Sequence, residues 1–167
     1  MATYYVSPTG SGTTCSLESP CALAYAYATK SSNGDTIKMG YGTYDKEITS
    51  TKLLTFEGTS ELGTGTEVLW VNTTGDSNTI INNSGGLNTF KNIHFKNAYS
   101  ASRSLVSDSA PGSQTVFEDC ILEVENTKGN KFFEARYTMM FDRCDFRGSG
   151  ACRGDPSITG NARQDRA

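Results

Sequence analysis

Phe90-Lys91-Asn92-Ile93-His94-Phe95 is the first of three related segments that decide the fold of this chain; the others are Phe117-Glu118-Asp119-Cys120-Ile121-Leu122 and Phe141-Asp142-Arg143-Cys144-Asp145-Phe146. Each segment has an apolar residue or a cysteine at its first, fourth and sixth positions. The segments start 27 and 24 residues apart. Such a period is too short for a folding domain and is typical of one coil of a solenoid. The sequence therefore predicts a repeat fold.

A second apolar pair precedes each segment at a similar period: Ile80-Ile81, Leu105-Val106 and Phe132-Phe133. The short apolar runs are separated by Gly, Asn, Ser and Thr, which leaves no room for helices between strands. A chain that winds around one axis pairs each coil with the next at about 4.8 Å and needs no helical crossover. We therefore predict an all-β fold, a parallel β-helix of about four to five coils.

One α-helix is expected near the N-terminus, from about residue 20 to residue 31. Ser19 is the predicted N-cap and Pro20 the first helical residue, and the helix should end near Asn33-Gly34. Such a helix would cover the open end of the coil stack, where unpaired strand groups would otherwise recruit other chains. The predicted β-helix domain spans residues 1–150, with coils from about 35 to 150.

Residues 151–167 are polar and lose the repeat. We expect these residues to form a C-terminal tail without strands. A chain cut from a longer protein would also end in such a tail. No second cap is visible in the sequence. Further coils of a larger protein, or another subunit, are therefore expected to cover the edge of the last coil.

Composition limits the classes of partner. Only 36% of the 167 residues are hydrophobic, the net charge is -3, and the 15 Lys and Arg residues are scattered along the chain. Scattered basic residues form no positive stripe, so nucleic acid is not an expected partner. We also expect no membrane span, because no apolar run is long enough. No secretory leader follows Met1, and the chain is interpreted as a mature region or a fragment.

Five cysteines are present, and their spacing lacks the paired ligands of a zinc site, so no metal site is predicted. Cys15 and Cys21 flank a short loop and are predicted to form a local disulfide in an oxidising compartment. Cys120 and Cys144 hold the same position in successive segments, which favours stacked small core residues. Cys152 is left over.

The first third of the chain resembles a known family. The residues concerned are Tyr4-Tyr5-Val6-Ser7-Pro8, Gly10, Gly12, the run from Pro20 to Ala28, Gly34-Asp35-Thr36-Ile37, Gly42-Thr43-Tyr44, and Leu53-Leu54-Thr55-Phe56 with Gly58. This pattern resembles the opening of right-handed parallel β-helix proteins of the pectate-lyase-like superfamily. The resemblance implies a right-handed coil and an extracellular or cell-surface location. Polysaccharide lyases and hydrolases share this fold with non-catalytic surface proteins, such as polymorphic outer-membrane proteins and other adhesins, so function stays open.

Alignment of the three segments places polar residues in three outward columns: Lys91, Glu118 and Asp142; Asn92, Asp119 and Arg143; and Lys96, Glu123 and Arg147. In the structural interpretation, opposite charges on adjacent coils stabilise the stack by about 0.2 to 1 kcal/mol per pair. The same columns would form a face for binding a glycan. The register of the early coils depends on whether residues 60–65 form an insertion loop.

An enzymatic interpretation uses the same face. Glu118 and Asp142 would lie about one coil spacing apart, close to the roughly 5 Å between the carboxylates of retaining glycosidases. A lyase would instead need carboxylates around a cation such as Ca²⁺ and a basic side chain. The residues available are Glu118, Asp119, Asp142 and Asp145 as ligands, with Arg143 or Arg147 as the base. The sequence contains neither the polygalacturonase motifs Asn-Thr-Asp, Asp-Asp and Gly-His-Gly nor the pectate-lyase motif Arg-x-Pro-x-x-Arg.

Three further features have both a structural and a functional interpretation. The single histidine, His94, lies between two apolar residues in strand phase, so its side chain is expected to point to solvent. The aromatic residues Trp70, Tyr4, Tyr5, Tyr41 and Tyr44 are more typical of packing than of stacking on sugars. The tripeptide Arg153-Gly154-Asp155 matches a sequence read by integrins, although three-residue matches arise readily by chance.

The sequence therefore predicts a non-catalytic, adhesin-like β-helix scaffold that binds a glycan or another surface. The alternative is a polysaccharide lyase or glycoside hydrolase that acts on a uronic-acid polysaccharide, or the N-terminal part of one. No cofactor is expected, apart from Ca²⁺ in the case of a lyase.

Overall fold

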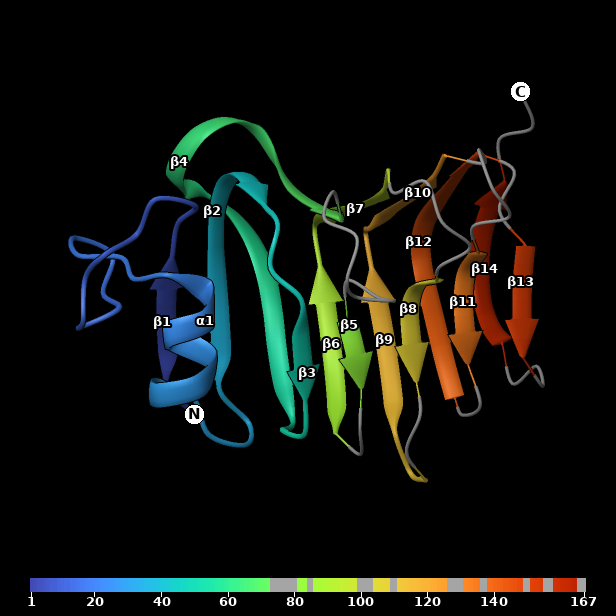
Figure 1. Cartoon of the computed structure of the whole chain (residues 1–167), viewed down its shortest axis with the longest axis horizontal. Helices are drawn as coiled ribbons and strands as arrows, with labels where there is room; N and C mark the ends of the chain where they lie inside the picture. The colour runs from blue at the N-terminus through green and yellow to red at the C-terminus, as the bar shows by residue number, and fades with distance from the viewer. Residues whose placement is uncertain are drawn as a thin grey trace.

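The repeated segments lie on successive coils of a parallel β-helix in a computed structural model of the chain (Figure 1). The structure describes residues 1–72, 81–83, 86–98, 104–108, 111–125, 131–135, 138–148, 151–154 and 158–164. Its elements are β1 (Thr3–Val6), α1 (Leu23–Tyr25), the π-helical turn η1 (Ala26–Lys30), β2 (Thr36–Tyr44), β3 (Ile48–Ser50), β4 (Leu54–Asn72), β5 (Ile81–Asn83), β6 (Leu87–Lys91), β7 (Ile93–Asn97), β8 (Ser104–Asp108), β9 (Gln114–Glu118), β10 (Ile121–Val124), β11 (Lys131–Ala135), β12 (Thr138–Gly148), β13 (Ala151–Gly154) and β14 (Ile158–Gln164).

The strands form two sheets. One sheet has the order β1-β2-β4-β6-β9-β12-β10-β7, with β14 also paired to β12 and β7 also paired to β4. The other has the order β13-β11-β8-β5-β3. The pairings between these strands are parallel, and Figure 1 shows both sheets running along the long axis from the N-terminal to the C-terminal end. The predicted all-β, parallel β-helix is confirmed.

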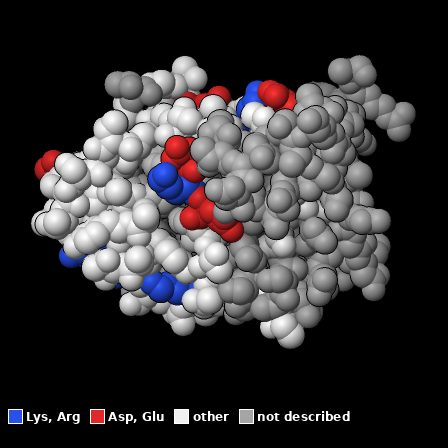
Figure 2. Space-filling model, viewed as in Figure 1, with Lys and Arg blue, Asp and Glu red and all other residues white. Residues whose placement is uncertain are grey.

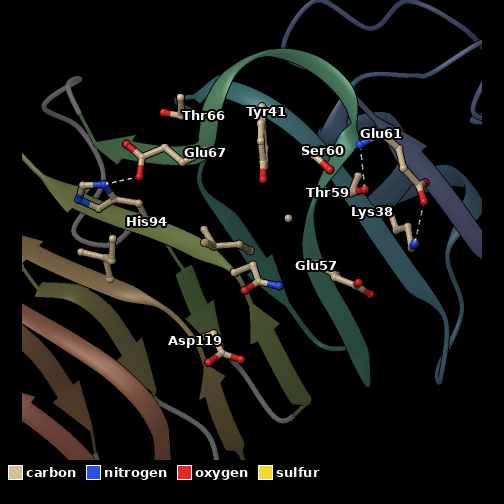
Figure 3. Close-up of a pocket in the computed structure, with 14 residues that line it drawn as sticks. Lys38, Tyr41, Glu57, Thr59, Ser60, Glu61, Thr66, Glu67, His94 and Asp119 are labelled. Carbon is tan, nitrogen blue, oxygen red and sulfur yellow. Dashed lines mark hydrogen bonds and ion pairs between the residues drawn. The ribbon is translucent and has the colours of Figure 1, made fainter.

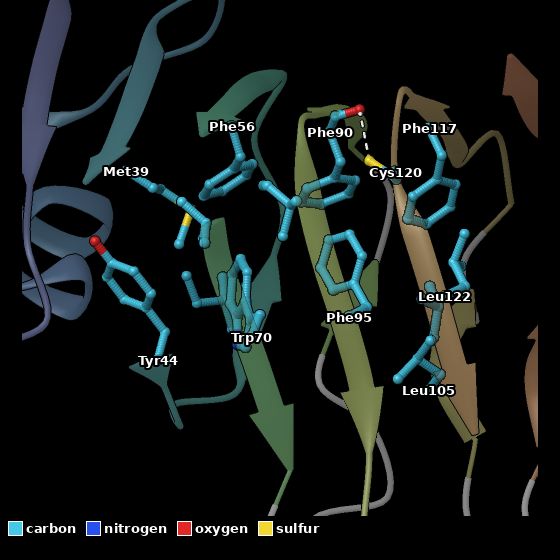
Figure 4. Close-up of a cluster of buried hydrophobic side chains, with 14 of the residues drawn as sticks. Met39, Tyr44, Phe56, Trp70, Phe90, Phe95, Leu105, Phe117, Cys120 and Leu122 are labelled. Atoms are coloured by element: carbon cyan, nitrogen blue, oxygen red, sulfur yellow. Dashed lines mark hydrogen bonds between the residues drawn. The ribbon is translucent and has the colours of Figure 1, made fainter. Parts of the chain in front are cut away.

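A column of phenylalanines fixes the register between coils. Phe56 pairs with Phe90, Phe90 with Phe117, and Phe117 with Phe141. Neighbouring rings stack with their centroids 5.1, 5.4 and 5.2 Å apart, inside the core (Figure 4). Burial of each ring contributes about 1.5 to 3 kcal/mol to stability. The repeated Phe residues therefore point into the core and stack between coils, as the sequence predicts.

A single residue with a left-handed backbone conformation bends each coil, between β6 and β7, between β9 and β10, and within β12. Asn92, Asp119 and Arg143 hold this position with φ values of 53°, 53° and 51°. Asn and Asp tolerate this conformation better than other residues with a side chain. The bend turns the next residue of each coil into the core. These core residues are Ile93, Cys120 and Cys144, each 1% exposed.

The N-terminal helix is shorter than predicted and begins later. The α1 helix starts at Leu23, and Ala22 holds its N-cap position. The prediction of Ser19 as N-cap and Pro20 as first helical residue is therefore wrong. The reason lies in Cys21, which forms a parallel bridge with a residue of β1 and keeps the preceding backbone extended.

The helix and the adjoining loop still close the N-terminal end of the core. Leu23 of α1 and Ala26 of η1 are buried in the same cluster as the first strands. Cys15 and Cys21 form a disulfide that ties the preceding loop together. Figure 1 shows α1 beside β1 at the N-terminal end of the sheets. The described helices are too short to cross a membrane.

The C-terminal end differs from the prediction. Residues 151–154 form β13 on β11, and residues 158–164 form β14 on β12. The prediction of a tail without strands is wrong for these residues, and the two sheets extend past residue 150. Hydropathy misses these strands because the backbone edge of the preceding coil pairs with a new strand whatever its side chains.

Candidate functional site

β4 leaves the coil at the corner where later coils have a single bend residue. Its register against β2 jumps from Gly40–Thr59 to Tyr41–Gly63 and then to Gly42–Val68. Residues 60–67 therefore form an excursion, which is the green arch at the top of Figure 1. The insertion considered for residues 60–65 is present. Beyond it, the pairing of Val68 with Ile93 returns the chain to the common register.

The excursion forms one wall of a hollow of about 500 Å³ at this corner, which we call the polar hollow (Figure 3). Tyr41 points into the polar hollow from β2. The lining adds three hydroxyl-bearing residues, Thr59, Ser60 and Thr66. It also contains six ionisable side chains, which are Lys38, Glu57, Glu61, Glu67, His94 and Asp119.

His94 fastens the excursion to the coils. Its Nδ1 atom lies 3.1 Å from Oε2 of Glu67 in the excursion, and its Nε2 atom lies 2.9 Å from Oε2 of Glu123 on the next coil. A neutral imidazole has one N–H, so both contacts are hydrogen bonds to carboxylates only in the imidazolium form. His94 is 9% exposed. The prediction that it points to solvent is wrong, because the excursion covers it.

Glu123 connects this cluster to the predicted outer column. Lys96 Nζ lies 2.9 Å from Glu123 and 2.8 Å from Glu125. Partial burial raises the pKa of Glu123, but hydrogen bonds from Lys96 and His94 outweigh burial, and the pKa lies below its usual range. The hydrogen bonds to Glu125 and Glu123 raise the pKa of Lys96. Glu123 therefore stays ionised and contacts both Lys96 and His94.

The predicted catalytic carboxylates lie in adjacent positions but are paired with cations. Glu118 and Asp142 are register neighbours, as the column alignment predicts. Lys91 Nζ lies 2.7 Å from Glu118, and Arg143 contacts Asp142. Arg143 also binds Asp119 at 2.6 and 2.8 Å, and these hydrogen bonds lower the pKa of Asp119.

One carboxylate of the polar hollow has no such partner. Glu57 lies in register between Lys38 and Lys91. However, Lys38 Nζ is 3.9 Å from Glu61, and Lys91 binds Glu118. Glu57 makes no ion pair with any residue that the structure describes. It is the carboxylate most available to a ligand.

The other predicted site residues lie outside the polar hollow. Arg147 pairs in register with Glu123, and its guanidinium lies 3.7 Å from Asp145. Arg153 and Gly154 belong to β13, whereas Asp155 lies outside the described residues. Within the described ranges, no group of three or more His, Cys, Asp or Glu side chains is arranged to hold a metal ion. On the face shown in Figure 2, described acidic and basic side chains lie beside one another.

The aromatic residues divide between core and site. Trp70 is 1% exposed and donates its indole N–H to the Lys46 carbonyl at 2.9 Å. The hydroxyl of Tyr44 is buried and donates to the Gly40 carbonyl at 2.9 Å, and burial raises the pKa of Tyr44. Both residues are core residues. Tyr41 is partly buried against the same core and also lines the polar hollow.

Sequence reasoning did not select Tyr41 or Glu57 as a site. The available signal was the run of residues 58–67, which is polar and Gly-rich and interrupts the register between two apolar strands. Such an interruption on one coil of a regular solenoid marks a loop on one face, which is often the binding face.

Comparison with known proteins supports the fold alone. No family model matches the sequence, and no curated protein matches it. Among solved structures, the chain is similar to pectate lyase Pel9A, with a TM-score of 0.51 and 16% sequence identity. The alignment covers 98% of this chain and 62% of that protein. The chain thus spans less than two thirds of the length of a pectate lyase with the same fold.

Proposed function

We propose that this chain is an extracellular or cell-surface β-helix scaffold that binds glycan in the polar hollow without turning it over. The observation that carries this proposal is the lining of the hollow. Tyr41 offers an aromatic face and a hydroxyl, Glu57 offers an unpaired carboxylate, and three further hydroxyls line the same hollow. Concave sites with an aromatic wall and a few convergent polar groups are the usual form of small-ligand sites.

The ion pairs on the neighbouring columns favour binding over catalysis. Glu118 and Asp142 each contact a cation, as described above. Ion pairs along a column of neighbouring strands stabilise the pairing of those strands. These carboxylates are therefore better suited to stabilising the coil stack than to proton transfer.

The proposed location rests on the disulfide and on the fold. The Cys15–Cys21 disulfide would persist in an oxidising compartment. A rigid coil stack whose outer face carries binding groups also fits a surface protein that engages polymers through many weak contacts.

A second candidate function is polysaccharide lyase or glycoside hydrolase activity. The register adjacency of Glu118 and Asp142 favours it, because one coil spacing is close to the roughly 5 Å of retaining glycosidases. In this alternative, the turnover would depend on these two carboxylates, with or without Ca²⁺.

One experiment separates the two candidates. The purified chain is mixed with neutral and acidic polysaccharides, with and without Ca²⁺, and binding is measured alongside new reducing ends and unsaturated-uronate absorbance. We expect binding that weakens at least about tenfold in Tyr41→Ala, with no product. Leu53→Ala, at an exposed residue outside the hollow, is the matched control. Product formation that disappears in Glu118→Gln or Asp142→Asn would show that the chain is an enzyme, and the proposal of binding without turnover would fail.

A further inference from the structure

A second hollow, also of about 500 Å³, is lined by other residues of the excursion. Its walls come from the N-terminal loop (Pro8 and its neighbours), from β2 at Tyr41 and Thr43, and from the excursion at Leu62. The described residues that line it carry no charge at neutral pH, and two of them are prolines. We call it the neutral hollow. Its chemistry suits the apolar face and the hydroxyls of an unsubstituted sugar ring.

Two glycines at this second hollow allow the chain to pack closely. A Cβ atom on Gly42 would lie 2.7 Å from Cγ of Pro8, and a Cβ atom on Gly63 would lie 2.0 Å from the carbonyl oxygen of Tyr41. Both residues also have positive φ values, 132° and 84°, which other residues adopt at a cost. Gly42 and Gly63 thus place backbone without side chains where β2 and the excursion meet.

Tyr41 belongs to the lining of both hollows. Its side chain points into the polar hollow, and its backbone neighbours, Gly42 and Thr43, line the neutral hollow. A ligand that contacted both hollows would therefore lie close to Tyr41. An aromatic side chain at this place presents a flat apolar surface and a polar tip to the ligand.

The charges of the combined site oppose acidic sugars. The polar hollow contains four carboxylates, Glu57, Glu61, Glu67 and Asp119, against two basic side chains, Lys38 and His94. Both basic side chains already contact carboxylates. A carboxylate on a ligand in the polar hollow would lie near Glu57. Among the described residues of the lining, no cation without a carboxylate partner is left to pair with it. Like charges at an interface are unfavourable.

Building on the glycan-binding function proposed above, we infer that the two hollows form one site for an uncharged oligosaccharide with sugar rings on both sides of Tyr41, and that Glu57 excludes uronates. The inferred ligand class thus differs from the pectate that gives the structurally similar lyase its name.

Matched pairs of hexasaccharides that differ only in charge test this inference. Suitable pairs are hexagalacturonate methyl ester against the free acid, and mannohexaose against hexamannuronate. Affinities are measured by calorimetry at neutral pH and moderate salt. For whichever backbone binds, we expect the neutral member to bind at least about tenfold tighter than the acid. In Glu57→Gln, the difference should shrink to about threefold. Equal or tighter binding of the acid by the wild type would overturn the inference.

The role of the neutral hollow is tested by ligand length. The wild type should bind the hexasaccharide at least about tenfold tighter than the disaccharide, because only the longer ligand reaches both hollows. Leu62→Glu should remove this gain, and Thr43→Glu, at an exposed position of the same hollow, serves as a second variant in case the first misfolds. An unchanged gain in folded variants would contradict a shared site. If no oligosaccharide binds the wild type, the proposed function itself fails; selective binding of acids removes only this inference.

Discussion

The imidazole of His94 lies 3.1 Å from the carboxylate of Glu67 and thereby joins the excursion of β4 to the coil beneath it. The other ring nitrogen of His94 contacts the next coil, so one side chain connects three successive turns of the β-helix. The wall of the polar hollow is therefore held by a partly buried polar contact. This arrangement predicts that the wall can be loosened without unfolding the coils.

Replacing His94 with alanine should release the excursion. We expect amide hydrogen exchange of residues 60–67 to increase at least about tenfold, with little change in the coils. Glycan affinity should fall at the same time, because Glu67 would no longer be held at the wall. Glu67→Gln is the matched variant, since it keeps the length of the side chain and removes its charge. Unchanged exchange in His94→Ala would show that the contact does not hold the excursion.

The phenylalanine column should account for much of the stability. Phe90 is 1% exposed and stacks on both Phe56 and Phe117. Phe90→Ala is expected to lower the free energy of unfolding by about 3 to 5 kcal/mol, because it leaves a cavity between two rings. Phe90→Leu, which refills most of the volume, should cost about 1 kcal/mol. Urea denaturation measures both values, and equal losses would contradict the cavity as the source of the loss and would point to the ring itself.

The corner conformation gives a prediction at Asn92. The backbone at position 92 has a φ of 53°. Asparagine or glycine adopts this conformation readily, whereas a β-branched residue is strained in it. Asn92→Val should lower the free energy of unfolding by about 1 to 2 kcal/mol, while Asn92→Gly should change it by less than about 0.5 kcal/mol. A similar loss in both variants would mean that the asparagine side chain, and not the backbone conformation, stabilises the corner.

Asp35 makes stability depend on acid. Its carboxylate accepts hydrogen bonds from the amides of Ala2 at 2.6 Å and Ser32 at 2.9 Å, and these bonds lower the pKa of Asp35. A carboxyl group whose pKa is lower in the folded state stabilises the protein above its unfolded pKa, and this contribution is lost as pH falls through the folded value. We expect Asp35→Asn to cost about 1 to 3 kcal/mol at pH 7.

The difference between wild type and Asp35→Asn should begin to shrink as the pH falls below about 4 and should disappear below the lowered pKa of the folded state. Thermal unfolding of both proteins between pH 2 and pH 7 measures it. A difference that stays constant over this range would exclude the charged form of Asp35 as its source.

Much of the fold follows from local sequence patterns. The spacing from Phe90 to Phe117 and Phe141 predicts the coil register correctly, because inward positions on a solenoid must stack apolar side chains. The Lys91–Glu118 pair follows from the same alignment. The extent of the helix could not be predicted in this way, because the bridge between Val6 and Cys21 is a tertiary contact that overrides a favourable N-terminal signal.

The candidate site was hidden for a similar reason. Strand periodicity correctly places His94 on the outer side of its coil, but periodicity cannot show that Glu67 of another coil covers it. Tyr41 looks like a packing residue in the sequence because aromatic residues there are more typical of packing than of stacking on sugars. The register break between β2 and β4 occurs at Tyr41 and places this residue in the lining of the polar hollow, whereas Tyr44 lies in the core.

Amide chemical shifts during titration with an uncharged oligosaccharide test the central claim most directly, because they locate the bound ligand on an 18.0 kDa chain. The account predicts saturable shifts concentrated at Tyr41 to Thr43, residues 57–67 and residues 92–94, and the loss of these shifts in Tyr41→Ala. Shifts concentrated instead around Lys96, Glu123 and Arg147 would contradict it, as would saturable binding that Tyr41→Ala leaves unchanged.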